Sequence, residues 1–276
     1  MSKDIVSHNE KAWDRLVEQR DRWTQPVSHE EILAAKDGNW QVILTGEEPV
    51  PRDWFPERLT GVDILCLASG GGQQDPILSA AGANITAFDN SPKQLERDRY
   101  VAEREGLSLT TVQGDMRDLS TFSDEQFDLV FHPVANVFVP DIQPVWAEAY
   151  RVLRPGGHLL AGFMNPVEFI FDSKELDEGR FVVKYSLPYS DIESISEQEW
   201  QERYGAEAPL EFSHTLEAQI GGQIQAGFVI VGFYESLRER GVIAEYMPSY
   251  IATRALKRAS DQMDRETPVA EKLSIK

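Results

Sequence analysis

The sequence ILCLASGGG occupies residues 64–72 and joins a short apolar run to three consecutive glycines. The apolar run has the length and composition of a buried strand, and a helical pattern begins after the glycines. Residues without a Cβ atom let a ligand approach the backbone at such a strand-to-helix turn. The stretch therefore predicts a ligand-binding turn, and a tight structural turn is the competing interpretation.

Short β-rich apolar runs alternate with helical patterns from residue 62 onward. This alternation is typical of a parallel sheet covered by helices on both faces, so the predicted fold class is α/β, a Rossmann-like doubly wound sheet. The last two runs have no long helix between them and could pair antiparallel. The predicted strands are residues 62–67, 84–88, 108–113, 127–132, 158–164, 228–234 and 250–256.

Two of the intervening helices carry start and stop signals. Asp75 precedes a proline and is expected to cap the first helix, which Gly82 follows. Ser91 and Gln94 have the spacing of a capping box at the start of the second helix, which Gly106 is expected to end. These signals support the strand and helix boundaries.

Two acidic residues follow strands at the predicted edge of the glycine turn. Asp89 ends the second strand, where a carboxylate can accept hydrogen bonds from both hydroxyls of a ribose. Asp115 follows the third strand and can accept a hydrogen bond from an adenine amino group. Each alone also fits a surface or capping residue, but together with the glycines they predict one crevice. NAD is disfavoured because Asp75 stands where a dinucleotide fingerprint has its third glycine.

Five motifs follow one another along the chain. They are LCLASGGG at 65–72, TAFDNSP at 86–92, VQGDM at 112–116, FDLV at 127–130 and YRVLRPGG at 150–157. As an ordered set over about residues 60–165 they resemble the class I S-adenosylmethionine-dependent methyltransferases. The resemblance implies S-adenosylmethionine as cofactor and a sheet of about seven strands whose last pair is antiparallel.

The resemblance also implies the roles of the site residues. Gly70 and Gly72 approach the methionine portion of the cofactor, and Asp89 binds the ribose. Asn90 lies beside the adenine, and Asp115 and Met116 lie on either side of the adenine. The predicted cofactor-binding residues are Ala68, Ser69, Gly70, Gly72, Asp89, Asn90, Asp115 and Met116.

The chain departs from the family pattern at two positions of the first motif. Cys66 stands where many members have an acidic residue, and Ala68 stands where the first motif glycine is usual. Both positions bear on the contacts to the amino-acid end of the cofactor.

Regions on either side of these motifs define the expected domain organisation. Residues 1–58 are predicted to form an N-terminal helical cap, and residues 59–257 the methyltransferase domain. Residues 165–213 interrupt the alternation with many aromatic side chains and are too long for a usual connection, which predicts a lid or substrate-binding insertion. Residues 258–276 form a polar tail. Three tryptophans of the cap, Trp13, Trp23 and Trp40, either pack it or close over the cofactor.

Methyl transfer to a hydroxyl, thiol or ammonium group also requires a proton to leave the acceptor. His132 ends the fourth strand and is the candidate catalytic base, with a structural role as the competing interpretation. Asn136 either orients substrate or stabilises its loop. His214 precedes a helix predicted at residues 216–226, which Thr215 is expected to cap.

Composition limits the partners and the compartment. The 276 residues include 27 basic and 46 acidic side chains, a net charge of -19, which disfavours a nucleic acid partner. The single cysteine, together with the absence of a signal peptide or a long apolar segment, predicts a cytoplasmic protein with no membrane partner. The five histidines show no ligand spacing, so no metal site is predicted.

The acceptor is predicted only as a class. The aromatic insertion and the acidic composition favour a small molecule with an apolar or cationic part, held under the insertion. A protein side chain is the alternative acceptor, and a non-catalytic S-adenosylmethionine-binding module is the alternative outside the enzyme class. The sequence predicts no particular oligomeric state.

Overall fold

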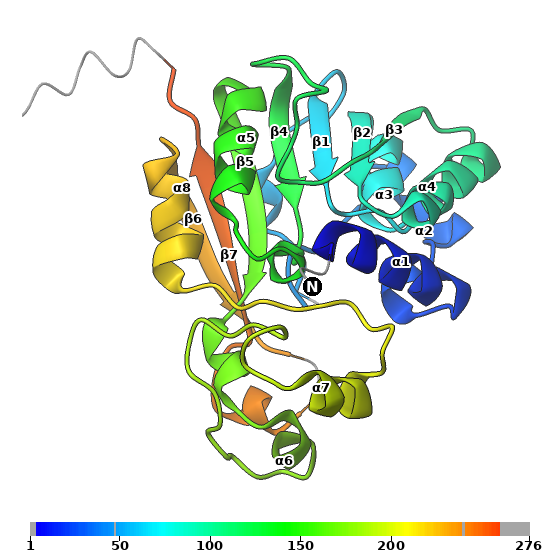
Figure 1. Cartoon of the computed structure of the whole chain (residues 1–276). Coiled ribbons are helices and arrows are strands. Elements are labelled where there is room, and N and C mark those ends of the chain that lie inside the picture. The colour runs from blue at the N-terminus through cyan, green and yellow to red at the C-terminus, as the bar shows by residue number, and fades with distance from the viewer. Residues whose placement is uncertain (1–3, 47, 239–240, 260–276) are drawn as a thin grey trace, which may run out of the picture.

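A single sheet of seven strands runs through the computed structural model, which describes residues 4–46, 48–238 and 241–259 (Figure 1). The strand order is β3-β2-β1-β4-β5-β7-β6; β1 to β5 are parallel and β7 is antiparallel to both of its neighbours. The predicted fold class and the antiparallel last pair are confirmed. The strands are β1 (Asp63–Leu67), β2 (Asn84–Asp89), β3 (Leu109–Gln113), β4 (Phe127–His132), β5 (Leu153–Met164), β6 (Val229–Ser236) and β7 (Tyr250–Leu256).

Helices cover both faces of the sheet. Successive side chains of a strand point to opposite faces, and here the side chains on both faces are apolar and need to be buried. In β1, Leu65 and Leu67 pack in the same buried cluster as α5, whereas Ile64 and Cys66 pack in a second cluster with α2, α3 and α4. The helices are α1 (Ile5–Glu18), α2 (His29–Lys36), α3 (Gln74–Ala80), α4 (Pro92–Glu105), α5 (Gln143–Val152), α6 (Ser173–Asp177), α7 (Glu197–Tyr204) and α8 (Gly222–Gln225).

Two elements differ clearly from the sequence prediction. β5 begins at Leu153 rather than at residue 158, because Gly156 and Gly157 of the expected turn exchange backbone hydrogen bonds with Lys257 and so continue the sheet. The helix predicted at residues 216–226 is a π-helix over Glu217–Gly221 followed by the short α8.

The helix caps agree in part with the sequence signals. Asp75 does not cap α3: it lies inside the helix, fully buried, and accepts a hydrogen bond of 2.5 Å from the Ser69 hydroxyl. Ser91 caps α4 by accepting a hydrogen bond from the Gln94 N–H, but the Ser91 N–H donates to Asp89 instead of completing a capping box. Gly106 ends α4 in the left-handed conformation, as predicted.

Residues 165–213, predicted as an insertion and called the insertion below, contain a small core separate from the two clusters against the sheet. It consists of Tyr189, Ile195, Trp200, Leu210 and Phe212. Below the sheet in Figure 1, this segment carries α6 and α7 and lies beside the edge of the sheet where β5 ends. Within the described residues, no helix is long and apolar enough to cross a membrane. Of the predicted polar tail, residues 260–276 lie outside the described residues.

Candidate active site

A cavity of about 920 Å³ lies at the carboxyl edge of the parallel strands. Its lining comes from the turns after β1, β2, β3 and β4, from α1 and the segment that follows it, and from the end of the insertion. Open α/β sheets bind their ligands at this edge. Seven of the eight predicted cofactor-binding residues line the cavity: Ala68, Ser69, Gly70, Asp89, Asn90, Asp115 and Met116.

The glycine turn presents its backbone to the cavity at Gly70. The Gly70 N–H donates a hydrogen bond of 3.1 Å to Asp89, and a Cβ atom at this position would lie 3.0 Å from the Cβ of Gln94. Ala68 adopts a left-handed conformation with φ 52°, the backbone geometry for which glycine is usual. Gly72 is the exception among the predicted residues, because its N–H donates to Asp98 and the turn directs it against the backbone of α4.

Asp89 is held by the backbone on either side of it. Its Oδ1 accepts a hydrogen bond of 2.9 Å from the Ser91 N–H, and its Oδ2 accepts from Gly70. Burial raises the pKa of Asp89 to about 6, although these backbone donors partly oppose the shift. The neighbouring Asn90 is anchored differently, since its side-chain amide donates to the Val6 carbonyl of α1.

Asp115 forms an ion pair with a nearby arginine. The Arg117 guanidinium donates hydrogen bonds of 3.0 Å and 2.6 Å to Asp115 Oδ2. Met116 is buried beside this pair. Asp115 can still accept a further hydrogen bond, since a carboxylate offers about four lone-pair sites.

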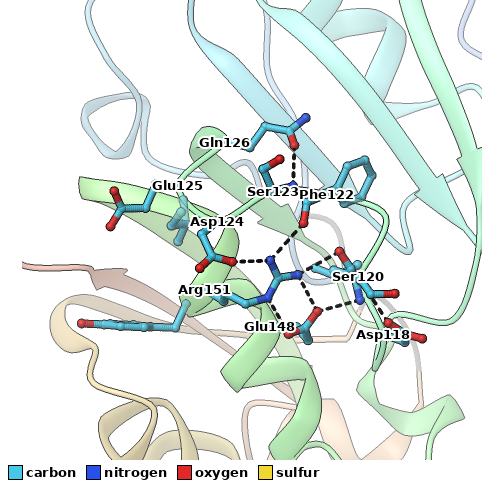
Figure 2. Close-up of polar contacts among 12 residues, drawn as sticks. Asp118, Ser120, Phe122, Ser123, Asp124, Glu125, Gln126, Glu148 and Arg151 are labelled. Carbon is cyan, nitrogen blue, oxygen red and sulfur yellow. Dashed lines mark hydrogen bonds and ion pairs between the residues drawn. The ribbon is translucent and has the colours of Figure 1, made fainter.

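The loop that follows Asp115 and Met116 is fixed by Arg151 of α5 (Figure 2). The guanidinium binds both carboxylate oxygens of Glu148 at 2.8 Å and donates to the carbonyls of Phe122 and Leu119 at 3.0 Å and 2.9 Å. Glu148 in turn accepts from the Leu119 N–H at 2.8 Å. The arginine of the YRVLRPGG motif therefore holds the loop and does not itself line the cavity.

Two buried carboxyl groups lie behind the glycine turn. Asp75 contacts Ser69, Asp98 accepts a hydrogen bond of 2.8 Å from the Gly72 N–H, and both residues are fully buried. Burial and mutual repulsion raise the pKa of Asp98, and burial raises that of Asp75 to about 7. This pair therefore binds the Ser69 hydroxyl and the Gly72 N–H from beneath the turn.

His132 is not among the residues that line the cavity, although Pro133 and Val134 are, and this argues against the predicted base. The ring is fully buried and packs edge-on against Trp146, with Nδ1 2.8 Å from the Leu67 carbonyl and Nε2 2.8 Å from the Asn136 side chain. Burial lowers its pKa. Because both ring nitrogens are engaged inside the protein, the structural interpretation of His132 is the one that the geometry supports.

The other residues singled out from the sequence also have structural partners. Asn136 contacts Gln219, and its carbonyl lies 2.9 Å from His214 Nε2, so both residues bind the protein itself. Thr215 accepts from the Ala218 N–H, in the capping role expected of it.

Two of the three tryptophans of the N-terminal segment line the cavity, and the third packs elsewhere. Trp13 and Trp23 line the cavity, and Trp13 also packs edge-on against Phe138. Trp40 instead packs against Phe55 and Arg52.

Sequence reasoning missed Glu211, Arg238 and Tyr250, which line the cavity beyond the glycine turn. One signal was available. Glu211 stands between Leu210 and Phe212, which are buried, and an acidic residue between two apolar ones in an extended segment indicates a side chain that faces the other way.

Comparison with known proteins agrees with this geometry. Residues 65–161 match a family model described as a methyltransferase domain. A Bacillus subtilis protein named uncharacterized methyltransferase YbaJ is 51% identical over 255 residues, which cover 92% of this chain and 98% of that protein. The chain belongs to the S-adenosylmethionine-dependent methyltransferases. It is accordingly an enzyme, and S-adenosylmethionine is its cofactor.

More distant relatives share only part of this methyltransferase. Sterol 24-C-methyltransferase erg6 of Aspergillus fumigatus is 40% identical over 100 residues, which are 35% of this chain and 26% of that protein. An S-adenosylmethionine-dependent methyltransferase from Mesorhizobium loti has a TM-score of 0.57 at 20% identity, covering 74% of this chain and 94% of that one, and so shares the fold.

The residues at the turn fit this cofactor. Gln94 lines the cavity, and its Oε1 is buried with no hydrogen-bond partner among the described residues, so it can accept from a donor of the bound molecule. At Gly70 a Cβ atom would crowd the Gln94 and Asp89 side chains, which glycine leaves in place beside the cavity. A carboxylate, a free amide oxygen and an open backbone suit a ligand with hydroxyl and ammonium donors.

Proposed function

We propose that this methyltransferase transfers the methyl group to a small-molecule acceptor inside its cavity. The observation that carries the proposal is the way α1 closes over the cavity. The Asn9 side chain donates to the carbonyls of Phe138 and Leu210 at 2.9 Å and 3.1 Å and accepts from the Leu210 N–H at 2.8 Å, which ties α1 to the insertion. A volume of about 920 Å³ under this cover is in the range of roughly 300–1,000 Å³ typical of small-molecule pockets.

We assign the cofactor to the side of the cavity over β1, β2 and β3. The assignment gives Gly70, with Ala68 and Ser69, to the methionine portion and Asp89 to the ribose. Asn90 and the pair 115–116 are assigned to the adenine. The resemblance to the family implies these roles, and the order of the strands and the side chains that line the cavity there support them.

When bound, the cofactor supplies a methyl group on a sulfonium, which is already electrophilic. The protein then needs chiefly to align the acceptor and exclude water, rather than to activate the methyl group. Trp13 and Phe138 contribute apolar surface to the cavity and serve the exclusion of water. Arg117 positions Asp115 through its ion pair.

Label transfer separates the small-molecule proposal from its alternative. The protein is incubated with S-adenosylmethionine labelled in the methyl group and with a cell extract split by size into metabolite and protein fractions. We expect label in the metabolite fraction, and less transfer with the Asp89→Ala variant when S-adenosylmethionine is limiting. Label confined to the protein fraction would favour a protein side chain as acceptor and overturn the proposal.

A further inference from the structure

The cavity continues beyond the proposed cofactor side to a second group of strand ends. In the sheet order, β4, β5, β7 and β6 follow β1 on the side away from β2 and β3. The antiparallel pairing of β7 places Tyr250 opposite both Met164 at the end of β5 and Ser236 at the end of β6. Met164, Tyr250 and Arg238 line the cavity here, on the side where an acceptor would meet the methyl group.

Glu211 is held firmly at this end of the cavity by its backbone. Its N–H donates a hydrogen bond of 2.7 Å to Asp191, whose other oxygen accepts from the Tyr189 hydroxyl at 2.6 Å. On either side, Leu210 is bound by Asn9, and the Phe212 N–H donates 2.7 Å to the Val137 carbonyl. With both neighbours directed into the insertion core, the Glu211 side chain is left facing the cavity.

The charge around Glu211 is not balanced within the protein. Among the described residues, none donates a hydrogen bond to the Glu211 carboxylate, and Asp191 adds a second negative charge nearby. Arg238 is the neighbouring cation, but it pairs at 3.4 Å with Glu168, whose side chain is only 5% exposed. Burial and the charge of Asp191 raise the pKa of Glu211 to about 7, while Arg238 opposes the shift. A cation bound next to Glu211 would therefore stabilise its ionised carboxylate.

We propose that Glu211 binds a cationic amine group of the acceptor at the β5, β7 and β6 end of the cavity, so that the enzyme is an amine methyltransferase. This inference rests on the proposed small-molecule function and names the class of substrate. The surrounding apolar surface, from Val134, Phe138 and Met164, suits an amine attached to an apolar group.

Glu211 can also accept the proton that methylation of an ammonium group releases. An ammonium group must lose a proton before its nitrogen lone pair can accept a methyl group, and the ionised Glu211 carboxylate can take that proton. In the part of the chain that the structure describes, the other titratable groups within electrostatic reach of Glu211 are Tyr204 and Asp191 from the insertion and Arg238 from the end of β6.

Binding of three probes of matched shape tests this proposal without requiring the natural acceptor. The full-length protein is saturated with S-adenosylhomocysteine and titrated calorimetrically with benzylamine, benzyl alcohol and benzoate. We expect benzylamine to bind at least tenfold more tightly than either other probe, and Glu211→Gln to abolish this preference. Glu207→Gln is the matched control, since Glu207 lies in the same segment but pairs at the surface with Arg15.

The outcomes separate this inference from the proposed function. Equal or tighter binding of benzyl alcohol or benzoate, no benzylamine binding at millimolar concentration, or a preference that survives in Glu211→Gln would each overturn the amine assignment. S-adenosylhomocysteine must still bind Glu211→Gln within about twofold of the parent, which shows that the variant is folded. Failure of S-adenosylhomocysteine to bind the parent protein would instead count against the proposed cofactor site.

Discussion

Removing the Arg151 side chain should destabilise the protein by about 3 kcal/mol. The two hydrogen bonds to the carbonyls of Leu119 and Phe122 contribute about 1 kcal/mol each. The paired contacts to Glu148 add about 1 kcal/mol after discounting for solvent screening, because the Arg151 side chain is 28% exposed. The Asp124 contact contributes close to nothing, since that carboxylate is 74% exposed.

Urea unfolding of Arg151→Ala, Arg151→Lys and Asp124→Asn measures these contributions. Lysine keeps the charge but cannot reproduce the planar fork, so Arg151→Lys should lose about 1–2 kcal/mol, less than the alanine variant. Asp124→Asn is the control and should lose under about 0.5 kcal/mol. Because the loop that Arg151 fixes follows Asp115 and Met116, the alanine variant should also bind S-adenosylhomocysteine more weakly. A loss for Arg151→Ala no larger than that of the control would refute the reasoning.

Three further changes test other parts of the structure. Asp75→Asn should flatten the pH dependence of stability. The pKa of Asp75 is about 7 in the folded protein and near 3.8 in the unfolded chain, so between these pH values only the folded protein holds the proton. The stability of the parent protein therefore falls as the pH rises between these values. Urea unfolding at pH about 5 and about 8 should show a parent difference about 2 kcal/mol larger than that of the variant, and equal differences would contradict the assigned burial cost. Asn9→Ala removes three hydrogen bonds between α1 and its neighbours and should lower the unfolding free energy by about 2–4 kcal/mol, so a loss under about 0.5 kcal/mol would show that α1 is not tied in this way. Gly70→Ala places a Cβ atom 3.1 Å from Asp89 and should weaken S-adenosylhomocysteine binding about tenfold or more in calorimetry, whereas Gly221→Ala, whose Cβ atom would meet only an ordinary contact at 3.6 Å, should not.

Much of the fold followed from the sequence because most of the strands are short, largely apolar runs that alternate with helical patterns. β4 and β7 have the predicted bounds, since each is buried between neighbours and ends where its pairing ends. β5 was predicted too short because RPGG is typical of a turn, whereas its glycines pair with Lys257, a contact between positions about a hundred residues apart.

The candidate site was predictable where it depends on strand ends and not where it depends on side-chain direction. The end of β2 was enough to place Asp89 at the cavity. His132 also ends a strand, but it shares a face with Val130 and points toward Trp146 of α5. Glu211 and Arg238 line the same cavity because the insertion packs against the sheet, and no local pattern encodes that packing.

The most direct test of the account is calorimetric titration of S-adenosylmethionine into the parent protein and Asp89→Ala, with NAD as a control ligand. The account predicts binding to the parent protein that Asp89→Ala weakens by about 1.5–3 kcal/mol, the contribution of a hydrogen bond to a charged group. Asp53→Ala, at an exposed acidic residue, should bind as the parent does. No binding of S-adenosylmethionine, or equal affinity in the parent and Asp89→Ala, would contradict the cofactor site proposed here.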